Sequence, residues 1–109
     1  MKAVVVHGPG DIRCENLPTP SPGPGEALVA VKAAGICSSD VPRALGGAAY
    51  FYPIVMGHEL AGEVEEVGTE VNGAHIGERV SVAPLLPCWQ CEWCQRGRYS
   101  LCDDYDYLG

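Results

Sequence analysis

The chain has 109 residues, and its 14 acidic against 7 basic residues give a formal net charge of −7 at neutral pH. This length suits one domain with one core, and the acidic balance argues against nucleic acid or an anionic membrane as a partner. The 14 glycines and 9 prolines make up about 21% of the chain, against roughly 12% in average proteins. Such a composition favours short strands joined by turns, and therefore an all-β fold.

No apolar run in the sequence approaches the ~20 residues that a membrane span requires. The first residues carry one positive charge, and the apolar run after it is shorter than the core of a signal peptide. We therefore expect a cytoplasmic protein, in which thiols stay reduced and clustered cysteines bind metal more often than they form disulfides.

The N-terminal residues predict a β-hairpin. Strands are expected over residues 2–7 and 11–17, joined by a turn at Gly8-Pro9-Gly10. Four prolines at alternate positions between residues 18 and 24 then exclude regular structure. This stretch is either a linker between domains or an extended surface loop, and we favour the loop because only 17 residues precede it.

The middle of the chain predicts three further strands and one helical turn. The strands are expected over residues 26–34, 59–67 and 79–85. The helical turn is expected over residues 38–45, with a serine or aspartate as its cap. The sequence contains no internal repeat.

Four cysteines follow these elements with the spacing C-x2-C-x2-C-x7-C: Cys88, Cys91, Cys94 and Cys102. Thiolates are soft ligands, and four of them can converge on one cation from a single short loop. Zinc held by four thiolates forms a closed tetrahedral site, which is structural rather than catalytic. This cluster therefore predicts a structural zinc.

Two other interpretations of the cysteine cluster stay open. The bacterial iron–sulfur motif begins with the same C-x2-C-x2-C spacing, but its fourth cysteine comes after three residues and precedes a proline. Here seven residues separate Cys94 from Cys102, and Asp103 follows. A disulfide pair is the third interpretation.

A second polar cluster is formed by Cys37, Ser39, Asp40, His58 and Glu59. Cysteine and histidine both bind zinc, and a catalytic zinc has three protein ligands and an open position for water or substrate. The third ligand would be Glu59 or a residue beyond Gly109. Taken alone, one cysteine and one histidine are more typical of a buried thiol and a hydrogen-bonded imidazole, and Asp40 is equally typical of a helix N-cap.

Five motifs occur in order: G-I-C-S-S-D at 35–40, G-H-E-L-A-G at 57–62, V-x-x-V-G at 64–68, G-E-R-V at 77–80 and the cysteine cluster at 88–102. Together they resemble the N-terminal, GroES-like catalytic domain of the zinc-dependent medium-chain alcohol and polyol dehydrogenases. The resemblance covers essentially the whole chain. It implies a mainly antiparallel, partly open barrel with short helical turns and a zinc-binding lobe, as part of a larger α/β enzyme.

Within that family, four shorter stretches resemble the subfamily that acts on galactitol 1-phosphate: Y-F-Y-P-I at 50–54, P-L-L-P-C at 84–88, G-R-Y-S-L-C at 97–102 and Y-D-Y-L-G at 105–109.

The resemblance implies two zinc ions per chain. Cys37 and His58 would bind the catalytic zinc, and Glu59 would lie beside the metal or on it. Ser39 would carry the alcohol proton away, and Asp40 would hold the other ring nitrogen of His58. The four clustered cysteines would bind the structural zinc in a protruding lobe over residues 87–103. Cys14 matches no ligand of the family.

The implied reaction is the oxidation of a secondary alcohol of a polyol or polyol phosphate to a ketone. Zinc lowers the pKa of the substrate hydroxyl, and a hydride passes to NAD bound by a Rossmann domain. No G-x-G-x-x-G fingerprint follows a strand in this sequence, so no residue is assigned to NAD or NADP binding.

We therefore expect residues 1–109 to be a catalytic domain truncated at its C-terminus. A further zinc ligand, a glutamate, and the Rossmann domain would lie downstream. Such a piece would be inactive alone, and the full-length enzyme would be a homo-oligomer acting on a small-molecule substrate. The alternative is a stand-alone zinc-stabilised β module that binds a partner, but an open metal site at Cys37 and His58 argues against a purely structural role.

Overall fold

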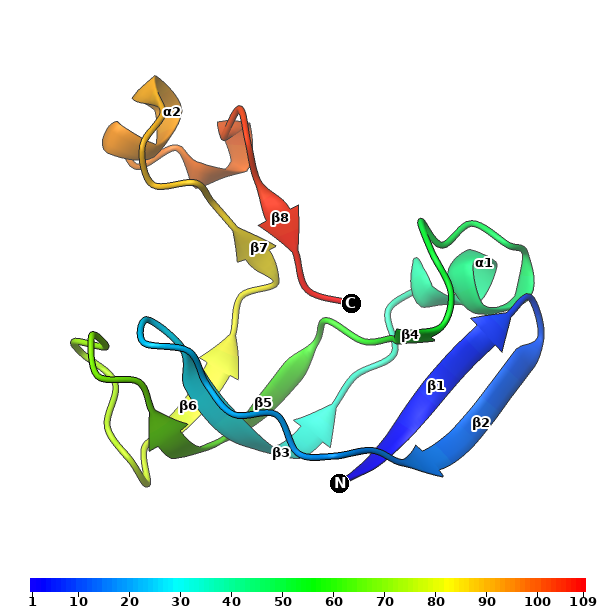
Figure 1. Cartoon of the computed structure of the whole chain (residues 1–109). Helices are drawn as coiled ribbons and strands as arrows, with labels where there is room; N and C mark the ends of the chain where they lie inside the picture. The colour runs from blue at the N-terminus through cyan, green and yellow to red at the C-terminus, as the bar shows by residue number, and fades with distance from the viewer.

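The N-terminal hairpin begins the first of three antiparallel sheets in the computed structural model, which describes residues 1–109 (Figure 1). Strand β1 (Lys2–Gly8) pairs with β2 (Asp11–Asn16) on one side and with the short β4 (Ile54–Val55) on the other. The valine run of β1 suits a pleated, half-buried surface, and Val5 and Val6 are buried. Gly10 adopts a φ of 77° in the turn, a conformation that glycine takes without strain.

The second sheet has the order β3-β5-β6, with β3 (Ala27–Ala34), β5 (Leu60–Val67) and β6 (Arg79–Val82). Its central strand buries Val64, and Gly62 lies so close to the backbone of Ala30 that a Cβ atom would collide with it. The strands expected over residues 26–34 and 59–67 are thus confirmed to within one residue.

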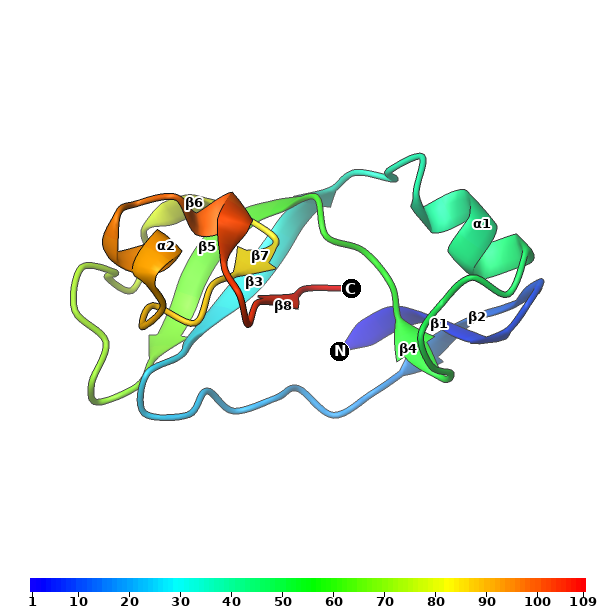
Figure 2. The same cartoon turned by 90° about the horizontal axis from the view of Figure 1, so that it is seen from above.

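The prolines between residues 18 and 24 lie in an extended, largely exposed segment that runs from β2 to β3 along one side of the molecule (Figure 2). Its end is fixed to the second sheet, because Gly68 and Glu70 donate backbone hydrogen bonds to the carbonyls of Glu26 and Pro24. The expectation of an extended surface loop is confirmed.

A lobe projects from the end of β6 (Figure 1). It contains β7 (Leu85–Leu86), α2 (Glu92–Gln95), the 3-10 turn η1 (Tyr99–Leu101) and β8 (Asp106–Tyr107), and β7 pairs with β8. The prediction of one strand over residues 79–85 is correct at its start and wrong at its end. The strand stops at Val82, because proline at position 84 has no N–H to donate to a ladder.

The helix α1 (Asp40–Leu45) begins two residues later than expected. The cap prediction is wrong in detail: Ser39 occupies the N-cap position but makes no side-chain cap bond. Asp40 is instead the first helical residue, and its carboxylate accepts the backbone N–H of Cys37. Neither α1, with six residues, nor any other helix has the length and apolarity needed to cross a membrane.

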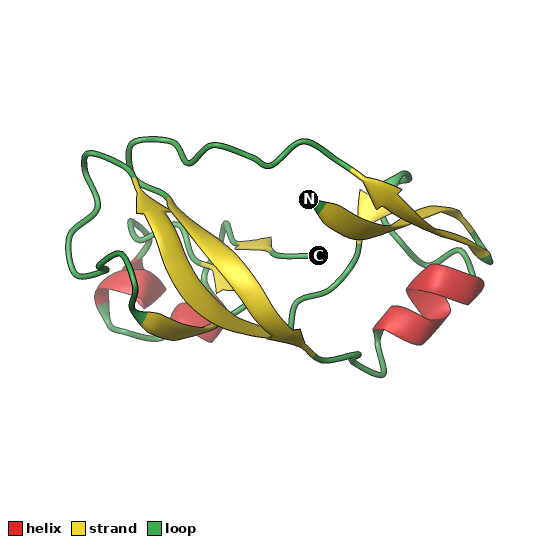
Figure 3. Cartoon of the chain, turned by 90° about the horizontal axis from the view of Figure 1, so that it is seen from below, coloured by secondary structure: helices red, strands yellow, loops and turns green.

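The chain leaves much of its surface uncovered. Its accessible area is 7612 Å², whereas a typical folded monomer of 11.5 kDa exposes about 5,800 Å². Figure 3 shows the two larger sheets apart, with the two ends of the chain between them. A cavity of about 500 Å³ between β1 and β3 has mostly apolar lining residues, Val4, Leu28 and Val31 among them. This surface is available to pack against further protein.

Mostly antiparallel strands, few short helices and sheets that are not joined into one closed ring confirm the expected fold class.

Candidate metal centres

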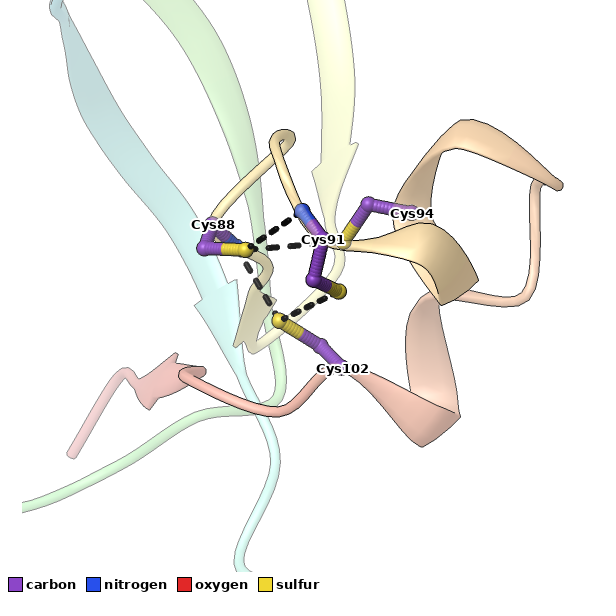
Figure 4. A group of neighbouring side chains, drawn as sticks. All are labelled: Cys88, Cys91, Cys94 and Cys102. Carbon is purple, nitrogen blue, oxygen red and sulfur yellow. Dashed lines mark hydrogen bonds between the residues drawn. The ribbon is translucent and has the colours of Figure 1, made fainter.

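The four cysteines of the lobe converge on one point (Figure 4). Cys88 and Cys91 lie between β7 and α2, Cys94 lies in α2, and Cys102 follows η1. Their four sulfur atoms all lie within 4.8 Å of one another, and the Cys88–Cys94 and Cys91–Cys102 pairs are each 4.0 Å apart. A tetrahedron with Zn–S bonds of about 2.3 Å has S–S edges of about 3.8 Å. The sulfur spacing therefore fits a tetrahedral metal site.

All six cysteines of the chain are free thiols. A disulfide requires an S–S bond of about 2 Å, about half of the observed sulfur separations. The disulfide interpretation of the cluster is therefore wrong for this structure.

Backbone N–H groups of the lobe point at the sulfur of Cys88. The amides of Gln90 and Cys91 lie 3.5 and 3.4 Å from it, and they lower the pKa of Cys88 to about 7 because they stabilise the thiolate. Trp89 adopts a φ of 61° between these residues, a left-handed conformation that costs a non-glycine residue roughly 1–3 kcal/mol. The turn at Trp89 brings the two amides back onto the sulfur.

The surroundings of Cys94 shift its pKa in the opposite direction from that of Cys88. Burial, followed by the neighbouring thiols of Cys102 and Cys91, raises the pKa of Cys94 to about 12. A thiol in such a place stays protonated unless a cation is present, and a coordinated thiol is deprotonated outright. The cluster thus combines one thiol that is ready to ionise with one that ionises only with a metal.

Cys37, His58 and Glu59 form a second cluster, in which one ligand atom from each residue lies within 4.8 Å of the others. The loop after β3 carries Cys37, and His58 and Glu59 directly precede β5. The N–H of Gly35 donates to the carbonyl of Glu59 at 2.7 Å, which extends the pairing of β3 with β5 to the cluster. The register of this strand pair therefore brings together residues that are 21 positions apart in the sequence.

Glycine is required beside Glu59 for space. A Cβ atom at Gly35 would meet the carboxylate of Glu59, and Gly57 has a φ of 132° just before His58. These two glycines allow the backbone to place the imidazole and the carboxylate next to each other.

Asp40, the first residue of α1, contacts both Cys37 and His58. Its Oδ2 accepts the N–H of Cys37 at 2.9 Å, and its Oδ1 lies 3.5 Å from Nδ1 of His58. Both Asp40 and His58 are buried. Because Nδ1 faces Asp40, Nε2 is the ring nitrogen that remains to act as a ligand.

Ser39 lies beside Cys37. Hydrogen bonds from the side chain and backbone of Ser39, and then from His58, lower the pKa of Cys37. A lowered pKa favours the thiolate, which is the metal-binding form of cysteine. The five residues singled out in this cluster from the sequence are thus close together, whereas Cys14 is exposed on β2 and belongs to neither cluster.

Cys37, Ser39 and His58 line a cavity of about 840 Å³, a size that suits a small-molecule site. Tyr107 of β8 closes one side, with its ring edge-on to the imidazole of His58 at a centroid distance of 5.8 Å. The other lining residues, for which no site role was predicted, are Arg43, Tyr50, Leu85, Ser100, Tyr105, Asp106 and Tyr107. All of them except Arg43 lie in the four stretches that resemble the galactitol 1-phosphate subfamily. Their meeting at one cavity is not visible in those stretches, because it depends on the pairing of β7 with β8 and on the placement of α1.

Residues 23–109 match the family model of the alcohol dehydrogenase GroES-like domain. The chain belongs to this family, as the five motifs indicated. Sorbitol dehydrogenase of Bacillus subtilis is 42% identical over 112 residues, which cover 99% of this chain and 32% of that protein.

Two solved structures show the same fold. The crystal structure of galactitol-1-phosphate dehydrogenase from Escherichia coli superposes with a TM-score of 0.94 at 39% identity, covering 100% of this chain and 32% of that one. The cobalt- and zinc-bound alcohol dehydrogenase from Pyrobaculum aerophilum has a TM-score of 0.87 at 37% identity, covering 94% and 32%. The chain thus spans about a third of the length of these relatives.

Proposed function

We propose that this chain is the zinc-binding catalytic domain of an NAD-dependent dehydrogenase that oxidises a secondary alcohol of a polyol or polyol phosphate to a ketone. The observation that carries the proposal is the convergence of Cys37, His58 and Glu59, of which Cys37 and His58 line an 840 Å³ cavity. The relatives named for sorbitol and for galactitol 1-phosphate support a polyol substrate.

The proposal includes two zinc ions, one structural and one catalytic. Residues 87–103 of the lobe offer four thiolates and no open position, which fits a structural ion. The second cluster offers one thiolate, one imidazole and one carboxylate. Three protein ligands, whether the third is Glu59 or the glutamate expected downstream, leave a tetrahedral ion one position for the substrate. A zinc ion bound there would act as a Lewis acid that lowers the pKa of the substrate hydroxyl and stabilises negative charge on its oxygen.

The chain's own residues then have separate tasks. Asp40 orients the His58 ring by facing Nδ1, so that Nε2 points away from α1. Ser39 lines the same cavity as Cys37 and His58, where its hydroxyl can accept the proton of the substrate alcohol and donate its own proton onward. Tyr107 packs edge-on against the imidazole of His58, with the ring centroids 5.8 Å apart.

In this proposal NAD is bound by a separate Rossmann domain, because residues 1–109 contain no dinucleotide fingerprint. These residues alone are therefore expected to be inactive. The full-length enzyme is expected to be cytoplasmic, since both clusters require reduced thiols. A homo-oligomer is expected from the family resemblance alone.

The proposal is tested with the full-length protein that contains these residues. Purified, zinc-loaded enzyme is mixed with NAD and with sorbitol, galactitol or galactitol 1-phosphate, and the formation of NADH is followed. At least one of these polyols is expected to be oxidised, and His58→Ala is expected to abolish turnover while the protein keeps its circular dichroism spectrum. Activity of His58→Ala near that of the wild type would contradict the proposed site.

The same preparation separates the proposal from a stand-alone zinc-stabilised β module. A protein that binds one zinc, loses it only on changes in the four-cysteine lobe and oxidises none of these polyols would favour the module. Visible absorption typical of iron and sulfide would identify an iron–sulfur cluster instead of a structural zinc.

A further inference from the structure

Arg43 is the only lysine or arginine that lines the cavity shared by Cys37, Ser39 and His58. It lies in the last turn of α1, and it also lines an adjoining cavity of about 310 Å³ together with Tyr50 and Tyr107. The guanidinium of Arg43 is therefore the one basic side chain at the cavity that Cys37 and His58 also line.

The backbone of Arg43 is held in place. The Tyr52 hydroxyl donates to the carbonyl of Arg43 at 2.6 Å, and Gly10 in the turn of the N-terminal hairpin donates to the carbonyl of Ala44 at 2.7 Å. The guanidinium donates one hydrogen bond, from Nη1 to the carbonyl of Gly109 at 3.0 Å. Because a guanidinium has five N–H donors, most of them remain available.

The charge of Arg43 has no carboxylate partner within residues 1–109. Arg13 pairs with Asp11 and Arg96 pairs with Glu92, but no acidic group lies within ion-pair distance of Arg43. The nearby Asp106 lines the same cavity and uses its Oδ1 to accept the backbone N–H of Tyr107. An arginine that has no carboxylate partner among residues 1–109, in the part-buried cavity that contains Cys37 and His58, offers hydrogen-bond donors to an anionic group of a substrate.

We propose that Arg43 binds the phosphate of a phosphorylated polyol while a hydroxyl of the same molecule lies at the Cys37–His58–Glu59 cluster. The planar guanidinium matches phosphate oxygens in a bidentate manner, and a cavity of about 840 Å³ accommodates a small sugar-alcohol phosphate. This inference rests on the proposed function and deepens it, since Arg43 selects the phosphorylated substrate over the neutral polyol. The names of the relatives leave this choice open, because one is a sorbitol enzyme and another a galactitol-1-phosphate enzyme.

The test compares the full-length wild type, Arg43→Gln, Arg43→Lys and the control Arg98→Gln. Arg98 is exposed in the lobe and lines none of the cavities that contain Cys37 or His58. Steady-state kinetics give kcat/KM for galactitol 1-phosphate and for galactitol. In Arg43→Gln the ratio of these two values is expected to fall roughly 10- to 100-fold, as the loss of hydrogen bonds to a charged group implies. Arg43→Lys is expected to recover part of the ratio, and Arg98→Gln to keep that of the wild type.

A second readout does not depend on turnover. Titration calorimetry of galactitol 1-phosphate and of inorganic phosphate into the protein without NAD is expected to show binding that weakens in Arg43→Gln and not in Arg98→Gln. An equal loss of kcat/KM for both polyols would overturn the inference in favour of a packing role. A rise in the KM of NAD with an unchanged ratio would overturn it in favour of the cofactor's pyrophosphate.

Failure of the proposed dehydrogenase function can be distinguished from failure of the Arg43 anion site. A wild type that oxidises neither polyol contradicts the dehydrogenase proposal, and the calorimetry then decides the anion site alone. Phosphate binding that Arg43→Gln abolishes supports the site, and binding that Arg43→Gln leaves unchanged overturns it.

Discussion

The Nδ1 atom of His58 lies 3.5 Å from Oδ1 of Asp40, and both atoms are buried without a hydrogen-bond partner. Buried polar groups are nearly always paired, because an unsatisfied one costs about 1–3 kcal/mol. The two atoms face each other across a gap that a shift of about 0.5 Å brings to hydrogen-bond length. Binding of a ligand to Nε2 on the other side of the ring would place the proton on Nδ1 and complete this hydrogen bond.

Replacement of Asp40 by asparagine is expected to weaken zinc binding at the Cys37–His58–Glu59 cluster by about 10- to 100-fold, the usual effect of removing a group that orients a ligating histidine. Competition between a chelator and the full-length protein measures the affinity. Asp104→Asn is the control, because Asp104 is exposed in the lobe. Equal zinc affinities of Asp40→Asn and the wild type would remove Asp40 from this role.

Replacement of Cys91 by serine is expected to release the lobe zinc and to lower the free energy of unfolding of the lobe by several kcal/mol. The reason is that binding of a structural zinc contributes directly to folding. Thermal unfolding with zinc analysis measures both effects. Cys14→Ser is the matched control: Cys14 is exposed and lies outside both clusters, so its change is expected to stay within about 0.5 kcal/mol. A Cys91→Ser protein that melts like the wild type would contradict a structural ion in the lobe.

Zinc binding to the lobe is expected to depend on pH in two regimes. Zinc competes with protons for the thiols, so its affinity rises with pH. Below pH 7 zinc must displace the proton of Cys88. Above pH 7 this proton is already lost, because the pKa of Cys88 is lowered to about 7 from the usual 9.0. The number of protons released per zinc is therefore expected to fall by about one as the pH rises through 7.

Calorimetry of zinc binding in buffers with different ionisation enthalpies counts these protons. Cys88→Ser is expected to remove the step near pH 7. A wild-type count that is constant between pH 6 and 8 would show that the amides of Gln90 and Cys91 do not stabilise the thiolate of Cys88 before the metal arrives.

Replacement of Gly35 by alanine is expected to displace the Glu59 carboxylate, because the new Cβ atom would occupy its place. The carboxylate is the end of a flexible side chain and can move, but the new Cβ atom also comes within 3.1 Å of the Cβ of Glu59. A small fall in the melting temperature is therefore expected together with a fall in the zinc affinity of the second cluster. Gly8→Ala is the control, since a Cβ atom at Gly8 meets nothing within 4 Å. Unchanged zinc affinity in Gly35→Ala would show that Glu59 does not contact the metal.

Local patterns predicted the longer strands and the structural cluster well. The β-branched run of β1 and the C-x2-C-x2-C spacing are each determined by residues that are close together in the sequence. The two-residue strands β4, β7 and β8 carry no such pattern, because they exist only by pairing with distant partners. Spacing cannot show that Cys37 lies next to His58 either, and only the resemblance to a family suggested it.

The residues that line the cavity also could not be predicted from local sequence patterns. Arg43 and Tyr107 are 64 positions apart, and they line one cavity because α1 and β8 approach it from different sides. An arginine near a helix end in an acidic protein is ordinarily paired with a neighbouring carboxylate. That Arg43 lacks such a partner becomes visible only in three dimensions.

Two metal ions in different surroundings are central to the proposed function. The most direct test is the anomalous scattering of zinc-loaded, reduced full-length protein at the zinc edge. Two peaks per chain are expected, one surrounded by the sulfur atoms of Cys88, Cys91, Cys94 and Cys102, and one between Cys37 and His58. A single peak in the lobe, with Cys37 and His58 turned away from each other, would contradict a catalytic zinc site in this domain.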